Sequence, residues 1–114
     1  MSHTILRLGF AAASLLAASA VLSGNAVASG AVVVCPVTGM VDDGLAVLVK
    51  RAVREAEGAQ ALVLEVDTPG GLVDSAIKIT SALTSARVHT IAYVKGMGAI
   101  SAGALISFAC DDII

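Results

Sequence analysis

The strongest constraint on the fold of this chain is an alternation of short apolar runs with helical patterns, repeated three times. The apolar runs, rich in β-branched residues, cover residues 31–37, 61–67 and 88–94. The helical patterns that follow them cover residues 45–56, 72–86 and 99–109. Strands that alternate with helices in this way form βαβ units around a parallel sheet. Because the runs are almost continuously apolar, we expect buried strands with helices over both faces of the sheet.

The helical patterns have recognisable starts and apolar faces. Asp42 or Asp43 can cap the first helix, and Gly58 supplies its stop. Its apolar positions are 45, 48, 49, 52, 53 and 56, with the charged residues Lys50, Arg51, Arg54 and Glu55 on the other face. The second helix carries Leu72, Ala76, Ile79 and Leu83 on one face, and the third is apolar all round. The last residues, "DDII", indicate a fourth strand that is only beginning.

The first 28 residues have the pattern of a secretory signal. "MSHTILR" carries a positive charge, "LGFAAASLLAASAVL" is uncharged and apolar, and "AVA" ends at Ala28. The apolar run is shorter than the roughly 20 residues that a spanning helix needs. We therefore predict cleavage after Ala28, export across the cytoplasmic membrane, and a mature domain over residues 29–114. The alternative is an uncleaved N-terminal anchor.

Charge and cysteine content exclude several classes of protein. Without Arg7 the chain carries six basic and nine acidic residues and has almost no aromatic side chains, which argues against nucleic-acid binding. Cys35 and Cys110 could form a disulfide after export, but both lie in apolar segments that favour buried free thiols. With His89 they do not make a metal site, and no cofactor is expected.

Two glycine-rich turns follow the second and third predicted strands. "DTPGG" spans residues 67–71, and "KGMGAIS" spans residues 95–101. The carboxyl ends of parallel strands meet at one edge of the sheet, where ligands bind, so both turns can face one crevice. Ser101 at a strand-to-helix turn could present its hydroxyl there as a nucleophile beside free backbone N–H groups. A serine at a helix start can equally be a simple cap.

Dinucleotide binding is the rival interpretation of the second turn. "GMGAIS" differs from the G-x-G-x-x-G pattern at its last position. That pattern belongs to the first βα turn, with an acidic residue about 20 residues later. Here it lies in the third turn, and Asp111 and Asp112 follow too soon. We rank it below the serine hypothesis.

The segment "ALVLEVDTPGGLVDSA", followed by a strand and "GAISAGALISFACDDI", resembles the N-terminal part of the long-form NfeD proteins. These are membrane-bound serine proteases of the ClpP class, related to signal peptide peptidase A. The resemblance extends from about Val32 to Ile114. It implies an α/β ClpP/crotonase-like fold of repeated βα units, truncated here at about the fourth strand.

The same resemblance implies roles for particular residues. Ser101 would be the nucleophile, Gly70 and Gly71 would line the substrate groove, and one of these glycines would form the oxyanion hole with the N–H of Ala102. Family members take a lysine base from a helix further downstream. The family also implies a peptide or membrane-protein substrate, membrane association, a stomatin-like partner and a homo-oligomer.

No lysine or histidine of this chain is a convincing base. Lys50 and Lys78 lie on charged helix faces, and His89 opens its strand roughly 20 Å away. Lys95 is near Ser101 in sequence and could touch the crevice, but a lysine at a strand end is usually just exposed. Asp67 is expected to position the "TPGG" turn. We therefore expect the 114-residue chain itself to be inactive and, with an open sheet edge, to associate. The alternative is a catalytically inactive membrane-associated interaction or assembly module.

Overall fold

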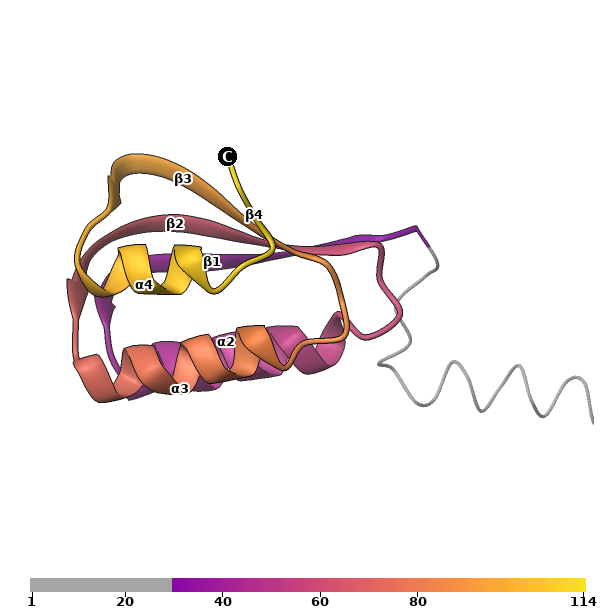
Figure 1. The fold of residues 1–114 in the computed structure, drawn as a ribbon, viewed down its shortest axis with the longest axis horizontal. Helices are drawn as coiled ribbons and strands as arrows, with labels where there is room; N and C mark the ends of the chain where they lie inside the picture. The colour runs from indigo at the N-terminus through magenta and orange to yellow at the C-terminus, as the bar shows by residue number, and fades with distance from the viewer. Residues whose placement is uncertain (1–29) are drawn as a thin grey trace, which may run out of the picture.

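The computed structural model describes residues 30–114, which form a four-stranded parallel sheet with three helices (Figure 1). The elements are β1 (Val32–Val41), α2 (Asp43–Glu55), β2 (Ala61–Gly71), α3 (Val73–Thr84), β3 (Thr90–Ala99), α4 (Ala102–Phe108) and β4 (Asp112–Ile113). The strands lie in the order β1-β2-β3-β4, and every neighbouring pair is parallel. The repeated βα units and the beginning of a fourth strand are confirmed. The predicted leader lies outside the described residues.

All three helices pack against the same face of the sheet, so the prediction of two covered faces is wrong for this part of the chain (Figure 1). Along β2, Leu62, Leu64 and Val66 are fully buried under the helices. The alternating residues Val63 and Glu65 are only partly buried. The cause is topological: each right-handed crossover leads to the next strand on the same side, which places every helix on one face.

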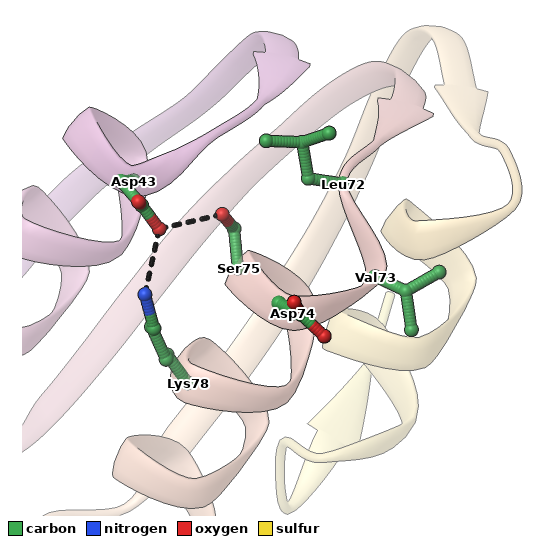
Figure 2. Close-up of a pocket in the computed structure, with 6 residues that line it drawn as sticks. All are labelled: Asp43, Leu72, Val73, Asp74, Ser75 and Lys78. Carbon is green, nitrogen blue, oxygen red and sulfur yellow. Dashed lines mark hydrogen bonds and ion pairs between the residues drawn. The ribbon is translucent and has the colours of Figure 1, made fainter.

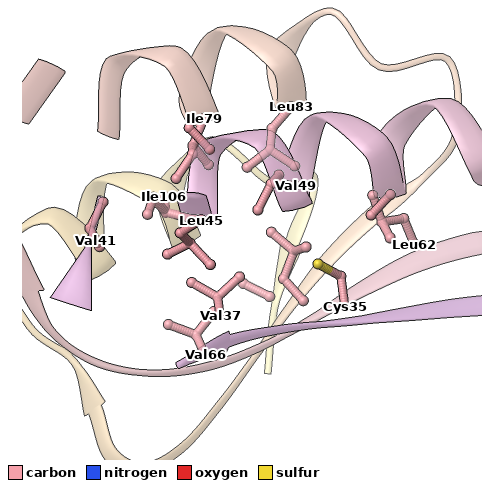
Figure 3. Packing of buried hydrophobic residues seen from close by; sticks show 14 of the residues in the cluster. Cys35, Val37, Val41, Leu45, Val49, Leu62, Val66, Ile79, Leu83 and Ile106 are labelled. Atoms are coloured by element: carbon pink, nitrogen blue, oxygen red, sulfur yellow. The ribbon is translucent and has the colours of Figure 1, made fainter. Parts of the chain in front are cut away.

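The core lies between this face and the helices (Figure 3). Side chains from β1, α2, β2, α3 and α4 meet there, represented by Val37, Val49, Leu62, Ile79 and Ile106, all fully buried. The apolar stripes were predicted correctly in their centres and wrongly at two positions. Leu48 and Leu72 are exposed, Leu72 being the N-cap residue that precedes α3, and Ala46 and Ser75 are buried instead.

The helix α2 begins where the sequence indicated. Of the two candidate caps, Asp42 is the one used, because its carboxylate accepts the Leu45 N–H at 2.8 Å. The helix ends at Glu55, shortly before Gly58, which has a φ of +84°. The cap fixes the direction in which the chain leaves the carboxyl end of β1.

The strand β1 is an edge strand, and the prediction of a fully buried first strand is wrong. Val32 and Val34 are about half exposed on the face without helices. Pro36 lies in the middle of this strand, which is tolerated because an edge strand has one side without hydrogen-bonding partners.

The strands continue beyond the points at which the sequence predicted turns. The "TPGG" segment belongs to the end of β2, and "KGMGA" to the end of β3. The ladders are irregular there, with register shifts between Thr38 and Met40 and between Val66 and Thr68. Instead of breaking sharply, the glycine-rich segments run side by side at the carboxyl edge of the sheet.

Candidate active site

Ser101 lies at this carboxyl edge, between β3 and α4, and is exposed. Its backbone has φ +53° and ψ −115°, and it is the only non-glycine residue in 30–114 with a positive φ. Its side chain makes no capping hydrogen bond, so the interpretation of Ser101 as a simple helix cap is wrong. Such a conformation costs of order 1–3 kcal/mol and is concentrated at functional sites.

The second glycine-rich turn packs directly against Ser101. A Cβ atom added to Gly70 would lie 2.9 Å from the Ser101 Cβ, 3.1 Å from the Ile100 carbonyl oxygen and 3.4 Å from the Ala102 nitrogen. Gly70 also has a φ of +105°. Only glycine fits this position, and the two turns face one another although 30 residues separate Gly71 from Ser101.

The backbone N–H groups beside Ser101 divide into used and available donors. The Gly70 N–H donates to Thr68 Oγ1 at 3.1 Å. Within residues 30–114, no hydrogen bond engages the Ala102 N–H. Gly71 packs so closely on β1 that an added Cβ would lie 2.3 Å from the Val41 carbonyl oxygen. The Ala102 N–H is therefore a candidate for holding an oxyanion, and Gly71 is the remaining glycine candidate because the Gly70 N–H is already bonded to Thr68.

No lysine of the described residues is hydrogen-bonded to Ser101 as a general base would be. Lys95 donates to Glu65 at 3.0 Å on the sheet face that carries no helices. Lys78 donates to Asp43 at 2.9 Å, and Lys50 is exposed on α2.

A second serine and lysine do lie together, where α2 and α3 begin (Figure 2). They line a pocket of about 290 Å³ with Asp43, Leu72, Val73 and Asp74. Ser75 is 1% exposed and donates to Asp43 at 2.8 Å, and Lys78 donates to the same oxygen. The hydrogen bond from Lys78 has the larger effect and that from Ser75 the smaller, and together they hold the pKa of Asp43 below its usual range.

This cluster lacks the properties of a nucleophile with its base. The hydrogen bond to Asp43 raises the pKa of Lys78, so its amine stays protonated. Ser75 is buried and already bonded. The cluster ties the start of α2 to α3. The sequence carried no signal for it, since the partners are 32 and 35 residues apart.

Asp67 holds a different turn from the one predicted. Its carboxylate accepts the Met97 N–H at 3.0 Å, and a Cβ added to Gly96 would collide with it. Asp67 therefore fixes the "KGMG" segment rather than "TPGG". A carboxylate packed into this turn also disfavours the phosphate binding of the dinucleotide hypothesis.

His89 lies at the opposite end of β3, as predicted. Its Nε2 is 2.7 Å from Asp112 Oδ2, and its Nδ1 is 3.6 Å from Asp111 Oδ2. Asp111 also accepts the backbone N–H and the hydroxyl of Thr90, which lowers the pKa of its carboxyl. The histidine belongs to a polar cluster at the amino edge of the sheet, away from Ser101.

Both cysteines are free thiols, as their apolar surroundings predicted. Cys35 is buried and Cys110 partly so. Burial raises the pKa of each thiol to about 11, which leaves them unreactive at neutral pH. Residues 30–114 contain no group of three or more metal-ligating side chains.

The arrangement defines a class of fold that comparison with solved structures confirms as ClpP-like. A ClpP1 mutant from Listeria monocytogenes matches with a TM-score of 0.54 at 18% identity, over 68% of this chain and 46% of that one, which shows the fold alone. The "1510-N membrane-bound stomatin-specific protease", crystallised as a serine-to-alanine mutant, matches with a TM-score of 0.71 at 28% identity, over 76% of this chain and 44% of that one.

Sequence comparison then gives the family. Residues 31–114 match the family described as "NfeD1b, N-terminal domain", and the chain belongs to it. It is 40% identical over 84 residues to the membrane protein NfeD1b of Bacillus subtilis, which covers 72% of this chain and 19% of that protein. It is 35% identical over 57 residues to the membrane-bound protease PH1510 of Pyrococcus horikoshii, which covers 48% of this chain and 13% of that protein. The chain thus spans less than a fifth of either relative.

Proposed function

We propose that this chain is part of a serine endopeptidase domain in which Ser101 is the nucleophile. The observation that carries the proposal is the strained backbone of Ser101, exposed and packed against Gly70 beside the Ala102 N–H. The similarity to the membrane-bound protease PH1510 supports a relationship to proteases. The 1510-N structures include the serine mutant above and a lysine-to-alanine mutant in complex with a substrate peptide.

The proposed reaction proceeds in two steps. The Ser101 Oγ attacks the peptide carbonyl carbon while a neutral lysine amine takes its proton. The carbonyl oxygen becomes an oxyanion, which the N–H groups of Ala102 and Gly71 stabilise. The C–N bond then breaks, and the leaving amine takes the proton from the lysine. In the second step the lysine takes a proton from water as the water oxygen attacks the acyl carbon. The bond to Ser101 Oγ then breaks, and the serine recovers its proton from the lysine.

We assign the general base to a lysine outside residues 30–114. A lysine base needs a lowered pKa and a position about 3 Å from the serine hydroxyl. Lys78 has a raised pKa, and Lys95 is ion-paired with Glu65 on the other face of the sheet. On this proposal the 114-residue chain alone does not turn over peptides.

The setting of the reaction is also part of the proposal. The relatives are membrane proteins, and the described residues contain no helix long and apolar enough to cross a membrane. We propose that the chain is exported by a leader ending at Ala28 and acts at the membrane on a peptide of a stomatin-like protein, as an oligomer. The substrate named for 1510-N supports this choice.

The second candidate function is a membrane-associated assembly module without catalysis. It is favoured by one observation within residues 30–114: Lys78 and Lys95 are held in ion pairs, and Lys50 is exposed on α2. The two candidates predict opposite results for a serine-reactive probe.

The deciding experiment measures peptide hydrolysis and fluorophosphonate labelling of the full-length gene product. The protease proposal predicts that Ser101→Ala abolishes both while leaving the melting temperature nearly unchanged, because it removes one exposed oxygen. Lys95→Ala is the matched control and should retain activity. Full activity of Ser101→Ala would refute the assignment, and unlabelled wild-type protein without turnover would favour the assembly module.

A further inference from the structure

We propose that Thr68 is a positioning residue that holds the Gly70 turn against Ser101 and thereby sets the rate of the chemical step. The inference rests on the proposed peptidase function and extends it to a residue that touches no substrate. Thr68 lies in the irregular end of β2 and is fully buried. Four of its contacts join the three segments that build the site.

The hydroxyl of Thr68 makes two of these contacts. It donates a short hydrogen bond to the Gly39 carbonyl oxygen in β1, and it accepts the Gly70 N–H at 3.1 Å. The Thr68 hydroxyl therefore links β1 to Gly70, the residue that packs against Ser101. Without it, the buried Gly70 N–H would lose its partner, and the turn could satisfy this N–H only by moving.

The rest of Thr68 contacts the chain on both sides of Ser101. Its carbonyl oxygen accepts the N–H of Ile100, the residue before the serine, at 3.1 Å. Its Cγ2 packs against Gly103 so closely that a Cβ added to Gly103 would lie only 2.5 Å from it. Thr68 therefore contacts the chain just before Ser101, at Ile100, and just after it, at Gly103.

Threonine suits this position better than its neighbours in shape or chemistry. Valine has the same outline but no oxygen, and serine has the oxygen but no Cγ2. The branched Cβ also restricts rotation about χ1, which keeps the hydroxyl directed at Gly39 and Gly70. The pair of substitutions Thr68→Val and Thr68→Ser therefore separates hydrogen bonding from packing.

The expected effect is on kcat rather than on KM. Thr68 is buried and cannot contact a peptide, so ground-state binding should hardly change. A displacement of about 1 Å between the nucleophile and the groups around it can cost on the order of 10²-fold in rate. Thr68→Val should thus lower kcat by roughly 10- to 100-fold with KM within about threefold of wild type, whereas Thr68→Ser should keep kcat within about threefold.

The test measures kcat, KM and the rate of fluorophosphonate labelling for wild type and both variants in the full-length gene product. Circular dichroism and thermal melts show which variants are folded. A loss of kcat and labelling rate in Thr68→Val with rescue in Thr68→Ser supports the proposal. Equal losses in both variants, or a loss confined to KM, overturn it. If Thr68→Val does not fold, Thr68→Ser decides alone: retained kcat supports the role of the hydroxyl, and a loss above tenfold refutes it.

Failure of this inference can be told apart from failure of the proposed function. An active wild type that loses turnover on Ser101→Ala, while Thr68→Val keeps its kcat, overturns only the role of Thr68. A wild type with no turnover and no labelling overturns the peptidase function and the positioning role together.

Discussion

At the scale of a single residue, the notable feature is the unfavourable backbone conformation of Ser101. Its φ of +53° is unfavourable for any residue with a Cβ, and its hydroxyl gains no hydrogen bond in return. The conformation persists because Gly70 packs closely against Ser101 and the adjoining backbone of Ile100 and Ala102. The residue is therefore held by its neighbours in a geometry that it would not adopt by itself.

Replacing Ser101 by glycine should relieve this strain. We expect the free energy of unfolding, measured by urea denaturation, to be about 1 kcal/mol larger for Ser101→Gly than for Ser101→Ala. The reason is that alanine keeps the strained Cβ and glycine does not. Both variants lack the proposed nucleophile, so a difference in activity does not enter the comparison. Equal stabilities would mean that the backbone at position 101 is unstrained.

At residue scale, the sequence predicted that Gly70, Gly71 and Ser101 would lie at the same edge of the sheet, because a glycine-rich segment after a strand is a local pattern. It could not predict that the Gly70 N–H is already bonded to Thr68, or that Asp67 serves the "KGMG" turn. Those contacts depend on the register of β2 against β3, which shifts irregularly between Val66 and Thr68. Periodicity does not determine such a shift.

At the scale of elements, the short helix α4 fits against β2 only because Gly103 lacks a side chain. Glycine inside a helix normally costs about 1 kcal/mol relative to alanine. Here an alanine Cβ would lie 2.5 Å from Thr68 Cγ2 and 3.7 Å from the Ala99 Cβ. Close packing of the helix on the strand therefore outweighs helix propensity.

This predicts an unusual pair of stabilities. Gly103→Ala alone should destabilise by roughly 1–3 kcal/mol through overpacking. In a background of Thr68→Ser, which removes the colliding methyl group, the same change should cost much less or become favourable. A double-mutant cycle by urea denaturation measures the coupling. Additive effects would show that the helix can shift away from the strand instead.

The elements themselves were largely predictable and their surroundings were not. Asp42, the alternating runs and the helix stripes gave the order of strands and helices, because those signals are local. Burial of the first strand was predicted wrongly, since an apolar run reads alike in the centre and at the edge of a sheet. The exposure of Val34 follows from the strand order, which sequence periodicity does not contain.

At the scale of the whole molecule, the sheet has one face without helices in the described residues. Val34, Val63 and Ile91 form one row across β1, β2 and β3 on this face, with Tyr93 nearby. Val34 is 55% and Tyr93 43% exposed. Parallel sheets are rarely left open in this way, and the unpaired edge of β1 adds free hydrogen-bonding groups.

We therefore expect the 114-residue chain to associate in solution when it is produced alone. Analytical ultracentrifugation at several concentrations should show oligomers or aggregates that diminish in Val34→Lys, because a charge on an edge strand opposes further pairing. Val47→Lys, on an exposed face of α2, is the matched control and should leave association unchanged. A monomer with sharp, cooperative melting would contradict the expectation.

The two edges of the sheet also differ in how freely they can be altered. Ser101 and the glycine-rich turns lie at the carboxyl edge, whereas the connections at residues 56–60 and 85–89 lead into the amino ends of β2 and β3. Both connections lie at the opposite end of the strands from Ser101 and Gly70. They are therefore the places where we expect an inserted fluorophore or affinity tag to leave Ser101 and the glycine-rich turns undisturbed.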